Sequence, residues 1–335
     1  MEWQKTLGGS AEEIANDIEI TADGGYIVVG YTRSEDGDVS VVHGWTDYWA
    51  VKLTNEGTIE WENSFGGAQH EAAQDVLQTN DGGYIMVGYS CSEAGQISGH
   101  IGLDDYWVVK LDSMGVMEWE KSYGGNGNDF GYAINQTSDG GYIIGGASES
   151  TNGDVTGNHG DYDYWVVKIT SEGDIEWEKS LGGSKDDFLY DLHQTSDGGY
   201  ILTGKSLSNN GDVSGHHGGG NFETDIWVVK LSATGDIEWQ KCLGSTDYEI
   251  GYSVQQTTDE GYIVAGFSSG EDGDVSQNLG EWDFWIVKLE SDGDIEWERS
   301  FGWYQKEIAH EIRETSDGGF IAVGYTESVL GSYGD

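Results

Sequence analysis

The dipeptide Glu-Trp recurs along the chain at a nearly fixed interval. Its tryptophans stand at positions 3, 61, 119, 177, 239 and 297, so successive copies are 58, 58, 58, 62 and 58 residues apart. The motif D-x-W-x-V-K-[LI] keeps the same interval, and the four extra residues of the fourth copy fall in its loop from His216 to Thr224. A constant period with insertions confined to one loop is typical of repeat architectures. We therefore predict one domain over residues 1–335, with repeat units of about 3–60, 61–118, 119–176, 177–238 and 239–296 and a partial unit 297–335.

Each unit contains four runs with the composition of β-strands. In the third unit these runs are 131–136, 142–148, 164–169 and 175–180, separated by the turn sequences T-S-D-G-G and S-E-G-D. The chain has 54 glycines and no proline, so its reversals depend on Gly, Asp and Asn turns, as in antiparallel hairpins. Four antiparallel strands repeated radially describe the blade of a β-propeller, and we predict an all-β propeller of this kind. A β-helix is the second choice.

The strand count favours six blades, of which the last is incomplete. The chain opens on a run of the fourth type (residues 2–6), continues with five full sets and ends with only a first run (309–314) and a second run (320–325). Five or seven blades are the alternatives.

A lysine and a glutamate face each other across the second hairpin of every full unit. Each lysine of the V-K motif precedes a glutamate by eight positions, as Lys168 precedes Glu176. That spacing across a short turn places the two side chains nearly opposite, so we interpret these lysines as structural.

The repeated sequence resembles a known family. The run D-Y-W-V-V-K-[LI], then S-x-G-D-I-E-W-E-K-S-L-G-G-S, then Q-T-S-D-G-G-Y-I, is similar to the SBBP-type β-propeller repeats of secreted and surface proteins in bacteria and some archaea. The resemblance covers essentially the whole chain. It implies a propeller, an extracellular or cell-surface location and often a larger parent protein, but no catalytic residue. Related sequences are sometimes labelled endoglucanase.

The charge of the chain limits its partners. It carries 61 acidic and 15 basic side chains, a net charge of −46. Such a surface repels nucleic acid and anionic membranes. No stretch of 18 apolar residues occurs and the first residues do not form a basic start with an apolar run, so we expect neither membrane insertion nor a signal peptide in this sequence. The two cysteines, Cys91 and Cys242, fall in different units and predict neither a disulfide framework nor a zinc motif.

The irregular loops should gather at one end of the sheets. Turns alternate between the two ends of an up-and-down sheet, so the tight D-G-G and x-G-D turns share one end. The long loop after the second strand and the G-G-x-x-[DE] loop before the next unit share the other. We expect any ligand there or at the mouth of the central channel.

The [DN]-G-D-[VI]-[ST] sequence in the long loop is a candidate calcium site. Oxygens at every second position can converge on a hard cation, although Ca²⁺ wants six to eight ligands and other groups must complete the shell. The alternative is a structural turn, since Asn-Gly and Asp-Gly favour positive φ and Asx side chains bond to nearby backbone. The second unit has Ala94 and Gln96 at these places. The candidate ligands are Asp36, Asp38, Asn152, Asp154, Asn210, Asp212, Asp272 and Asp274.

Aromatic and histidine side chains of the same loops are candidate ligand contacts. Eleven of the 14 tryptophans belong to the two strand motifs, where we expect core packing. Three histidines that each precede a glycine lack the spacing of a transition-metal site, and a solvated or capping role is the alternative for them. The candidate contact residues are Trp45, Tyr162, Trp282, Trp303, His43, His159 and His217.

A non-catalytic binding or adhesion module fits this pattern best. A repeat supplies each residue several times, whereas an active site needs it once, and no nucleophile-elbow, zinc-helix or phosphate-loop motif occurs. We expect a monomeric domain that presents acidic loops, stabilised by Ca²⁺, to a glycan or surface protein. The alternatives are an endoglucanase-like glycoside hydrolase, which needs one pair of carboxylates at a defined separation, and a pure scaffold.

Overall fold

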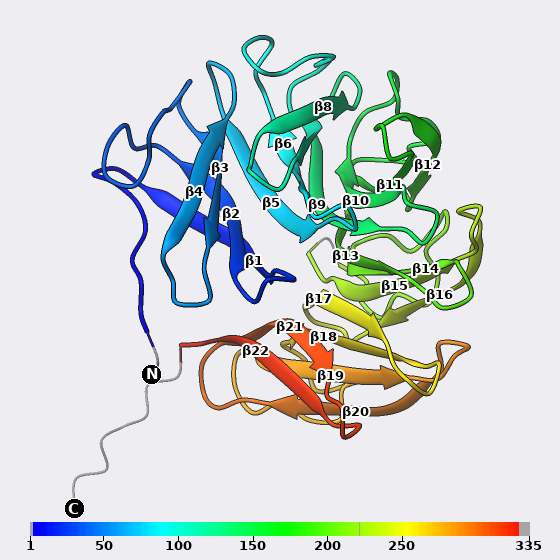
Figure 1. The fold of residues 1–335 in the computed structure, drawn as a ribbon. Coiled ribbons are helices and arrows are strands. Elements are labelled where there is room, and N and C mark those ends of the chain that lie inside the picture. The colour runs from blue at the N-terminus through cyan, green and yellow to red at the C-terminus, as the bar shows by residue number, and fades with distance from the viewer. Residues whose placement is uncertain (1–2, 221, 328–335) are drawn as a thin grey trace, which may run out of the picture. The chain divides into compact units, whose positions relative to one another are not determined.

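A computed structural model describes residues 3–220 and 222–327 of the chain (Figure 1). The backbone divides into two compact units, Met1–Asn158 with Trp165–Ser180, and His159–Tyr164 with Leu181–Asp335. We call them unit 1 and unit 2. The described residues form five four-stranded antiparallel sheets and one two-stranded sheet. No helix long and apolar enough to cross a membrane occurs among them.

The strands of the first three sheets follow one another in sequence order, and each pairs with the next along the chain. The first sheet contains β1 (Glu13–Ile20), β2 (Tyr26–Thr32), β3 (Asp47–Leu53) and β4 (Ile59–Phe65). The second contains β5 (Glu71–Gln78), β6 (Tyr84–Ser90), β7 (Asp105–Leu111) and β8 (Met117–Tyr123). The third contains β9 (Asp129–Gln136), β10 (Tyr142–Ser148), β11 (Asp163–Ile169) and β12 (Ile175–Leu181).

The remaining sheets repeat this plan and end with a two-stranded one. The fourth contains β13 (Asp187–Gln194), β14 (Tyr200–Ser206), β15 (Asp225–Leu231) and β16 (Ile237–Leu243). The fifth contains β17 (Glu249–Gln256), β18 (Tyr262–Ser268), β19 (Asp283–Leu289) and β20 (Ile295–Phe301). The sixth contains β21 (Glu307–Glu314) and β22 (Phe320–Thr326).

The third strand of each full sheet is almost completely buried. All seven residues of β7 are buried. Tyr106 stacks obliquely on Trp165 with ring centroids 4.6 Å apart, and its hydroxyl donates to the Trp165 carbonyl at 2.9 Å. Tyr48 with Trp107 and Tyr164 with Trp227 repeat this contact. The predicted core packing is confirmed for the tryptophans of the third strands, whereas the described tryptophans of the Glu-Trp motif are partly buried or, for Trp3, 38 % exposed.

The two tight turns of each full sheet lie at the same end, as predicted, and one lysine at that end contacts residues of both hairpins. The Lys168 side chain is only 3 % exposed, and its ammonium group lies 2.7 Å from Glu176 and 3.1 Å from Asp139 of the T-S-D-G-G turn. It also donates to the Ile169 carbonyl at 3.2 Å. The predicted cross-strand Lys–Glu pair is therefore confirmed, and the structure adds a second carboxylate to it. The same arrangement surrounds Lys52, Lys110, Lys230 and Lys288.

The predicted strand at residues 2–6 is wrong for the described part, residues 3–6, which form no ladder. Trp3 still packs edge-on against Tyr26 at 5.8 Å, as Trp61 of β4 packs against Tyr84 at 5.6 Å. The Trp3 ring therefore makes the contact expected of its motif, but residues 3–6 pair with no strand among the described residues. The predicted first and second runs at the C-terminal end are confirmed as β21 and β22.

Candidate functional site

The long loops and the G-G-x-x loops meet at one end of each sheet, here called the loop end. In the third sheet the Asn126 backbone N–H donates to Oδ1 of Asn152 at 2.9 Å, and the Gly124 N–H donates to Asp154 at 3.3 Å. Asn126 and Gly124 belong to the G-G-x-x loop, and Asn152 and Asp154 to the long loop. The predicted meeting of these two kinds of loop is confirmed.

The [DN]-G-D-[VI]-[ST] sequence forms a tight turn at the loop end. In the third sheet the Val155 N–H donates to the Asn152 carbonyl at 3.3 Å across Gly153, whose φ of 72° requires glycine. The corresponding glycines of the first, fourth and fifth sheets also have positive φ. The side chains proposed as calcium ligands accept backbone N–H groups in the same pattern at Asp36, Asp38, Asn210, Asp212, Asp272 and Asp274. These hydrogen bonds support the interpretation of the sequence as a structural turn.

Calcium binding at these loops stays a prediction. Among the described residues no three His, Cys, Asp or Glu side chains are grouped so that they could hold a metal ion. The two candidate ligands of a loop, such as Asn152 and Asp154, already accept backbone N–H groups. Backbone carbonyls, amides and water would have to supply the rest of a calcium shell.

A buried carboxylate anchors the loop end in the third and fourth sheets. Asp187, the first residue of β13, is fully buried and accepts the Gly183 N–H at 2.8 Å and the Ser208 hydroxyl at 2.9 Å. The Ser206 hydroxyl also donates to it. Burial raises the pKa of Asp187 to about 6 against the effect of these hydrogen bonds. Asp129 has the same surroundings and a pKa raised by burial to about 6.

A second buried carboxylate lies close to the first. A Cβ atom built on Gly182 would stand 2.5 Å from Oδ1 of Asp163 and 2.6 Å from Oδ2 of Asp187, so both carboxyl groups converge on this glycine. Among the described residues Oδ1 of Asp163 is buried without a hydrogen-bond partner. Burial raises the pKa of Asp163 as well. Two carboxyls this close resist double ionisation, which favours retention of a proton by the pair.

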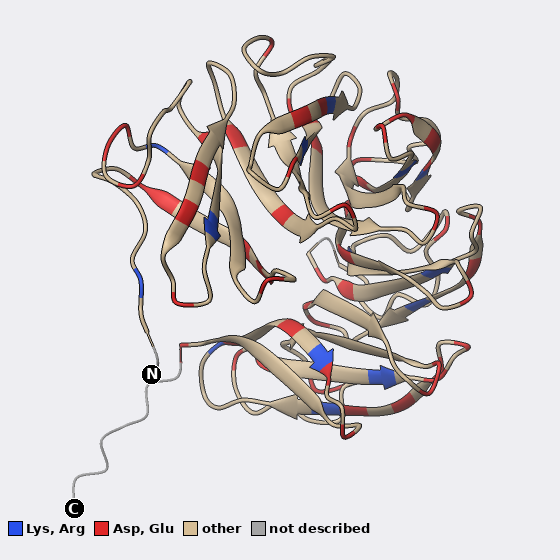
Figure 2. Cartoon of the chain, viewed as in Figure 1, with Lys and Arg blue, Asp and Glu red and all other residues tan. Residues whose placement is uncertain are grey.

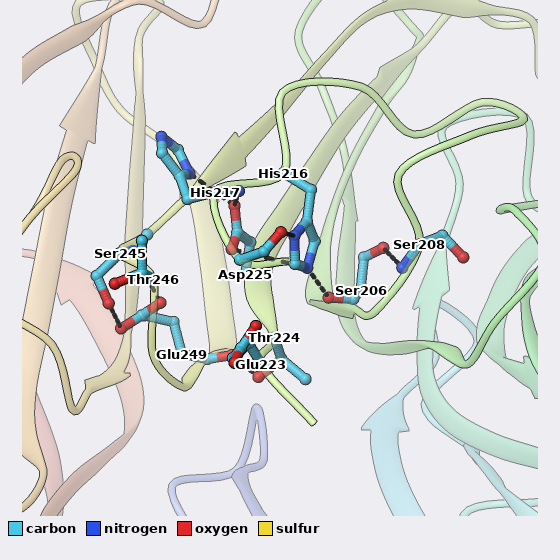
Figure 3. A network of polar contacts seen from close by, with 12 residues as sticks. Ser206, Ser208, His216, His217, Glu223, Thr224, Asp225, Ser245, Thr246 and Glu249 are labelled. Atoms are coloured by element: carbon cyan, nitrogen blue, oxygen red, sulfur yellow. Dashed lines mark hydrogen bonds and ion pairs between the residues drawn. The ribbon is translucent and has the colours of Figure 1, made fainter. Parts of the chain in front are cut away.

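The three candidate histidines are fixed by the carboxylates that begin the third strands. Oδ2 of Asp225 accepts from Nδ1 of His217 at 2.7 Å and from its backbone N–H at 3.0 Å (Figure 3). His159 contacts Asp163 through the same two groups at 2.9 and 2.7 Å, and His43 contacts Asp47 at 2.6 and 2.7 Å. Their ring orientation is therefore set by the fold.

The fixed imidazoles remain partly accessible through Nε2. The side chain of His217 is 27 % exposed, and its Nε2 lies 3.5 Å from Asp274 of the next long loop. Burial opposes protonation, but the hydrogen bond to Asp225 and the charges of Asp225 and Asp274 raise the pKa of His217 above its usual value. His216 lies on the other side of Asp225, with Nε2 3.2 Å from the Ser206 carbonyl (Figure 3).

The four candidate aromatic contacts divide into exposed and packed rings. Trp45 is 72 % exposed and Trp303 is 63 % exposed. Trp282 is half-buried, stacked on Phe267 with ring centroids 4.6 Å apart, and carries the Lys306 ammonium 3.8 Å above its ring. Tyr162 is half-buried against Phe188 at 4.8 Å.

Sequence reasoning missed a chain of rings in unit 2, three of them on first strands and one on β22. The rings of Tyr190 (β13), Tyr252 (β17), His310 (β21) and Tyr325 (β22) follow one another at centroid distances of 5.3, 5.1 and 5.8 Å. These side chains are half-buried or exposed. We call these four residues the ring chain. Tyr162 joins it through Phe188, which is 6.5 Å from Tyr190, and Trp282 joins it through Phe267, which is 6.4 Å from Tyr252.

A β-bulge turns the first members of the ring chain out of the regular alternation. The register of the first and second strands shifts between Leu189 and Asp191, between Gly251 and Ser253, and between Ala309 and Glu311. The extra residue in each case is Tyr190, Tyr252 or His310. Bulges re-aim a side chain and are common beside functional sites. The recurrence of aromatic residues at the same place in the repeat was the sequence signal that could have revealed them.

Comparisons with known proteins support the fold. No family model and no curated protein matches the sequence, so the predicted SBBP-type family remains a prediction. The chain is similar in structure to the Pan2 WD40 domain of Neurospora crassa, with a TM-score of 0.51 and 12% identity over 89% of this chain and 68% of that chain. Weaker matches are Sqt1 from Chaetomium thermophilum (TM-score 0.45, 10% identity, 92% and 79% covered) and a Bacteroides caccae protein of unknown function (0.44, 11%, 86% and 81%).

Together, the repeated four-stranded sheets and the similarity to a WD40 domain establish an all-β, propeller-class fold, as predicted. At this level of identity the comparison concerns the fold alone.

Proposed function

We propose that this protein is a non-catalytic β-propeller module that binds a glycan chain. The observation that carries the proposal is the ring chain of unit 2. Sugar rings present apolar C–H faces that pack on aromatic side chains, while their hydroxyls need polar partners nearby. A row of rings 5.1 to 5.8 Å apart offers consecutive contacts to a polymer.

The first strand of a propeller blade lies beside the central channel, which is a common place for ligands. In unit 2 the first strands β13, β17 and β21 pack against one another, so their bulged residues form a continuous surface. Acidic groups surround these strands (Figure 2), which favours a neutral or cationic partner over an anionic one.

The proposal can be tested by electrophoresis in gels that contain a soluble neutral polysaccharide, because a bound polymer slows migration. Tyr190→Leu and Tyr252→Leu keep apolar bulk but remove the aromatic face, and each should weaken retention about 2- to 10-fold, equivalent to about 0.5–1.5 kcal/mol per ring. Tyr190→Phe and Tyr252→Phe should retain most of the binding.

Phe222→Ala is the matched control, because this ring is 86 % exposed and contacts none of the ring chain in the described structure. Equal migration of wild type and both leucine variants in every polysaccharide gel would refute the glycan proposal and leave a protein partner or a scaffold role.

A glycoside hydrolase is the less favoured alternative. Asp129 and Asp187, whose pKa burial raises to about 6, have the acidity of a general acid, but both are fully buried and bonded to serine hydroxyls. A general acid must reach the glycosidic oxygen.

Calcium is proposed as a stabilising ion of the loop end. Titration of Ca²⁺ into chelator-treated protein should then release or absorb heat and raise the melting temperature. Asp154→Asn should reduce this heat and this rise in melting temperature. The loop of the second unit, which has Gln96 at the equivalent position, is the natural example of a loop without this carboxylate. An unchanged melting temperature in millimolar Ca²⁺ removes the ion from the proposal. A secreted or surface location and a monomeric state are likewise proposed, and are tested by cell fractionation and light scattering.

A further inference from the structure

Two pockets occupy the same place in different units. The first, of about 390 Å³, is lined by His43, Asn63, Phe65, Gln96, Val116 and Met117 and lies in unit 1. The second, of about 440 Å³, is lined by His217, Lys241, Leu243, Asp274, Asp294 and Ile295 and lies in unit 2. The two sets of residues correspond position by position in the repeat, in the order given. We call them the first and second inter-sheet pockets.

Each inter-sheet pocket is formed by the same four elements. One wall is the fourth strand of one sheet, β4 or β16. The opposite wall is the turn between the third and fourth strands of the next sheet. Long loops supply the histidine and the residue opposite it, Gln96 or Asp274. Their volumes fall in the range of about 300–1,000 Å³ typical of small-molecule sites.

The histidine of each pocket is fixed before any ligand arrives. His43 and His217 each give Nδ1 and the backbone N–H to a fully buried carboxylate, Asp47 or Asp225. Nδ1 is thus occupied in both, and the side chains are 32 % and 27 % exposed. His43 offers Nε2 to its pocket, whereas Nε2 of His217 faces Asp274 across its pocket at 3.5 Å. A fixed, half-exposed imidazole loses little conformational entropy when it forms a hydrogen bond to a ligand.

The equivalent space between the second and third sheets is filled by the side chain of Tyr123. Tyr123 of β8 corresponds to Phe65 and Leu243, and its hydroxyl donates to the Gly173 carbonyl at 2.6 Å across the gap. Tyr123 is only 4 % exposed. Phe65 lacks the hydroxyl and Leu243 is shorter, so both leave the space open. The protein thus contains its own example of a filled pocket.

The lining of the two pockets has one ligand chemistry in common. The first combines the neutral groups of Asn63 and Gln96 with apolar Phe65, Val116 and Met117. The second replaces Asn63 by Lys241, but this ammonium group is paired with Asp294 at 2.6 Å. Both pockets therefore combine hydrogen-bonding groups with an apolar wall. At the equivalent positions Asn63 is neutral, and the charge of Lys241 is paired with Asp294. A ligand that suits both is neutral, rich in hydroxyls and apolar on one face.

We propose that the two inter-sheet pockets are a repeated site for a single neutral sugar residue. This inference rests on the proposed function for its ligand class but uses different residues from the ring chain. In the first pocket Nε2 of His43 and the side chain of Gln96 bond to sugar hydroxyls. In the second pocket the paired His217 and Asp274 do so, and Phe65 or Leu243 contacts the C–H face. Two such sites on one chain increase its avidity for a branched or repeating glycan.

The test uses protein-observed NMR titration with neutral methyl hexopyranosides, with methyl glucuronide and methyl glucosaminide as charged probes. A neutral glycoside should shift the amide signals of Val116 in the first pocket and of Asp294 in the second. Phe65→Tyr should abolish the shifts at Val116 and preserve those at Asp294, and Leu243→Tyr should do the reverse. These substitutions copy Tyr123, and signals elsewhere in the spectrum report whether the fold is retained.

Phe301→Tyr is the matched control, because Phe301 is the equivalent residue of β20, is 49 % exposed and lines neither pocket. It should leave both sets of shifts unchanged. The inference is overturned if no neutral glycoside shifts either reporter, if the shifts survive the tyrosine substitutions, or if only a charged glycoside binds. If wild type shows no such shifts but is retained by a polysaccharide, the pockets alone are refuted. If wild type is retained by no polysaccharide in the gel assay, the proposed function is refuted.

Discussion

Lys168 shows how one side chain can hold the two hairpins of a sheet together. Its ammonium group is nearly inaccessible to water, yet it contacts two carboxylates and a backbone carbonyl, so its charge is fully compensated. Burial opposes the effect, but hydrogen bonds from Thr137, Gly141 and Lys168 lower the pKa of Asp139 to about 2. The stabilisation at Asp139 is therefore present above about pH 4 and is lost as the pH falls toward 2.

Replacing this lysine should destabilise the protein. We expect Lys168→Met to lower the free energy of unfolding by about 1–3 kcal/mol, since it removes charged hydrogen bonds while the partner carboxylates keep some contact with water. Urea denaturation measures the change. The exposed Lys5 provides the control substitution Lys5→Met, which should have little effect. Equal midpoints for the two variants would show that the buried pairs contribute nothing.

Asp187 should make stability depend on pH in the opposite direction from Asp139. Its pKa is raised by burial to about 6 in the folded protein, from 3.8 when unfolded, so the folded state binds more protons between these values. The free energy of unfolding should therefore fall as the pH rises from about 4 to about 6. Relative to Asp187→Asn, the wild type should lose on the order of 2–3 kcal/mol across this window.

Chemical denaturation of both proteins at pH 4, 5, 6 and 7 measures this difference. Because Asp139 and its equivalents titrate below about pH 4, they contribute little within the window. Parallel stability curves for wild type and Asp187→Asn would mean that Asp187 is ionised in the folded protein at every pH tested.

At the scale of the strand and turn, two glycines that both have a positive φ face different surroundings. Gly140 in the first hairpin turn has a φ of 89° and open space where a Cβ would stand. Gly153 at the loop end has a φ of 72°, and a Cβ there would stand 2.3 Å from the Gly124 carbonyl oxygen. The first glycine is needed for its dihedral angle only, and the second for the close approach of two loops as well.

These two glycines make a matched pair of substitutions. Gly140→Ala should cost about 1–2 kcal/mol, the strain of the left-handed region. Gly153→Ala should cost a further 1–3 kcal/mol, because the backbone must move to relieve the overlap. Thermal unfolding of both variants checks the order. A smaller effect for Gly153→Ala would contradict the close contact between the loops.

The sequence predicted the regular elements well for a physical reason. Strand bounds in the third sheet differ from the predicted ones by at most two residues, since Asp-Gly-Gly turns and alternating burial are local signals. Residues 3–6 were misjudged because a strand needs a neighbour to pair with, which no local pattern reveals. The ring chain was missed because a bulge changes the direction of Tyr190 without changing the residue pattern around it.

At the scale of the whole molecule, the dominant feature is the large excess of negative charge. The net charge of −46 is spread over strands and loops of both units (Figure 2), so like charges repel throughout the folded chain. This total follows from the sequence, but which carboxylates the fold buries does not. Asp163 and Asp187 are such a case, because their proximity depends on two separate loops.

Salt should therefore stabilise the protein. Raising NaCl from about 0.01 M to about 1 M shortens the screening length from about 30 Å to about 3 Å, which weakens the repulsion between exposed carboxylates. We expect the melting temperature at pH 7 to increase steadily over this range. A melting temperature that falls with added NaCl would show that the attractive pairs, such as Lys168 with Glu176, outweigh the net repulsion.

The central claim is that bulged aromatic residues on the first strands hold a glycan chain. Hydrogen–deuterium exchange, with and without a polysaccharide that retards the protein in gels, tests it most directly. Added polysaccharide should slow exchange in β13, β17 and β21 around Tyr190, Tyr252 and His310, and leave the hairpin turns around Asp139 and Asp197 unchanged. Protection confined to those turns, or absent from the three strands, would contradict the claim.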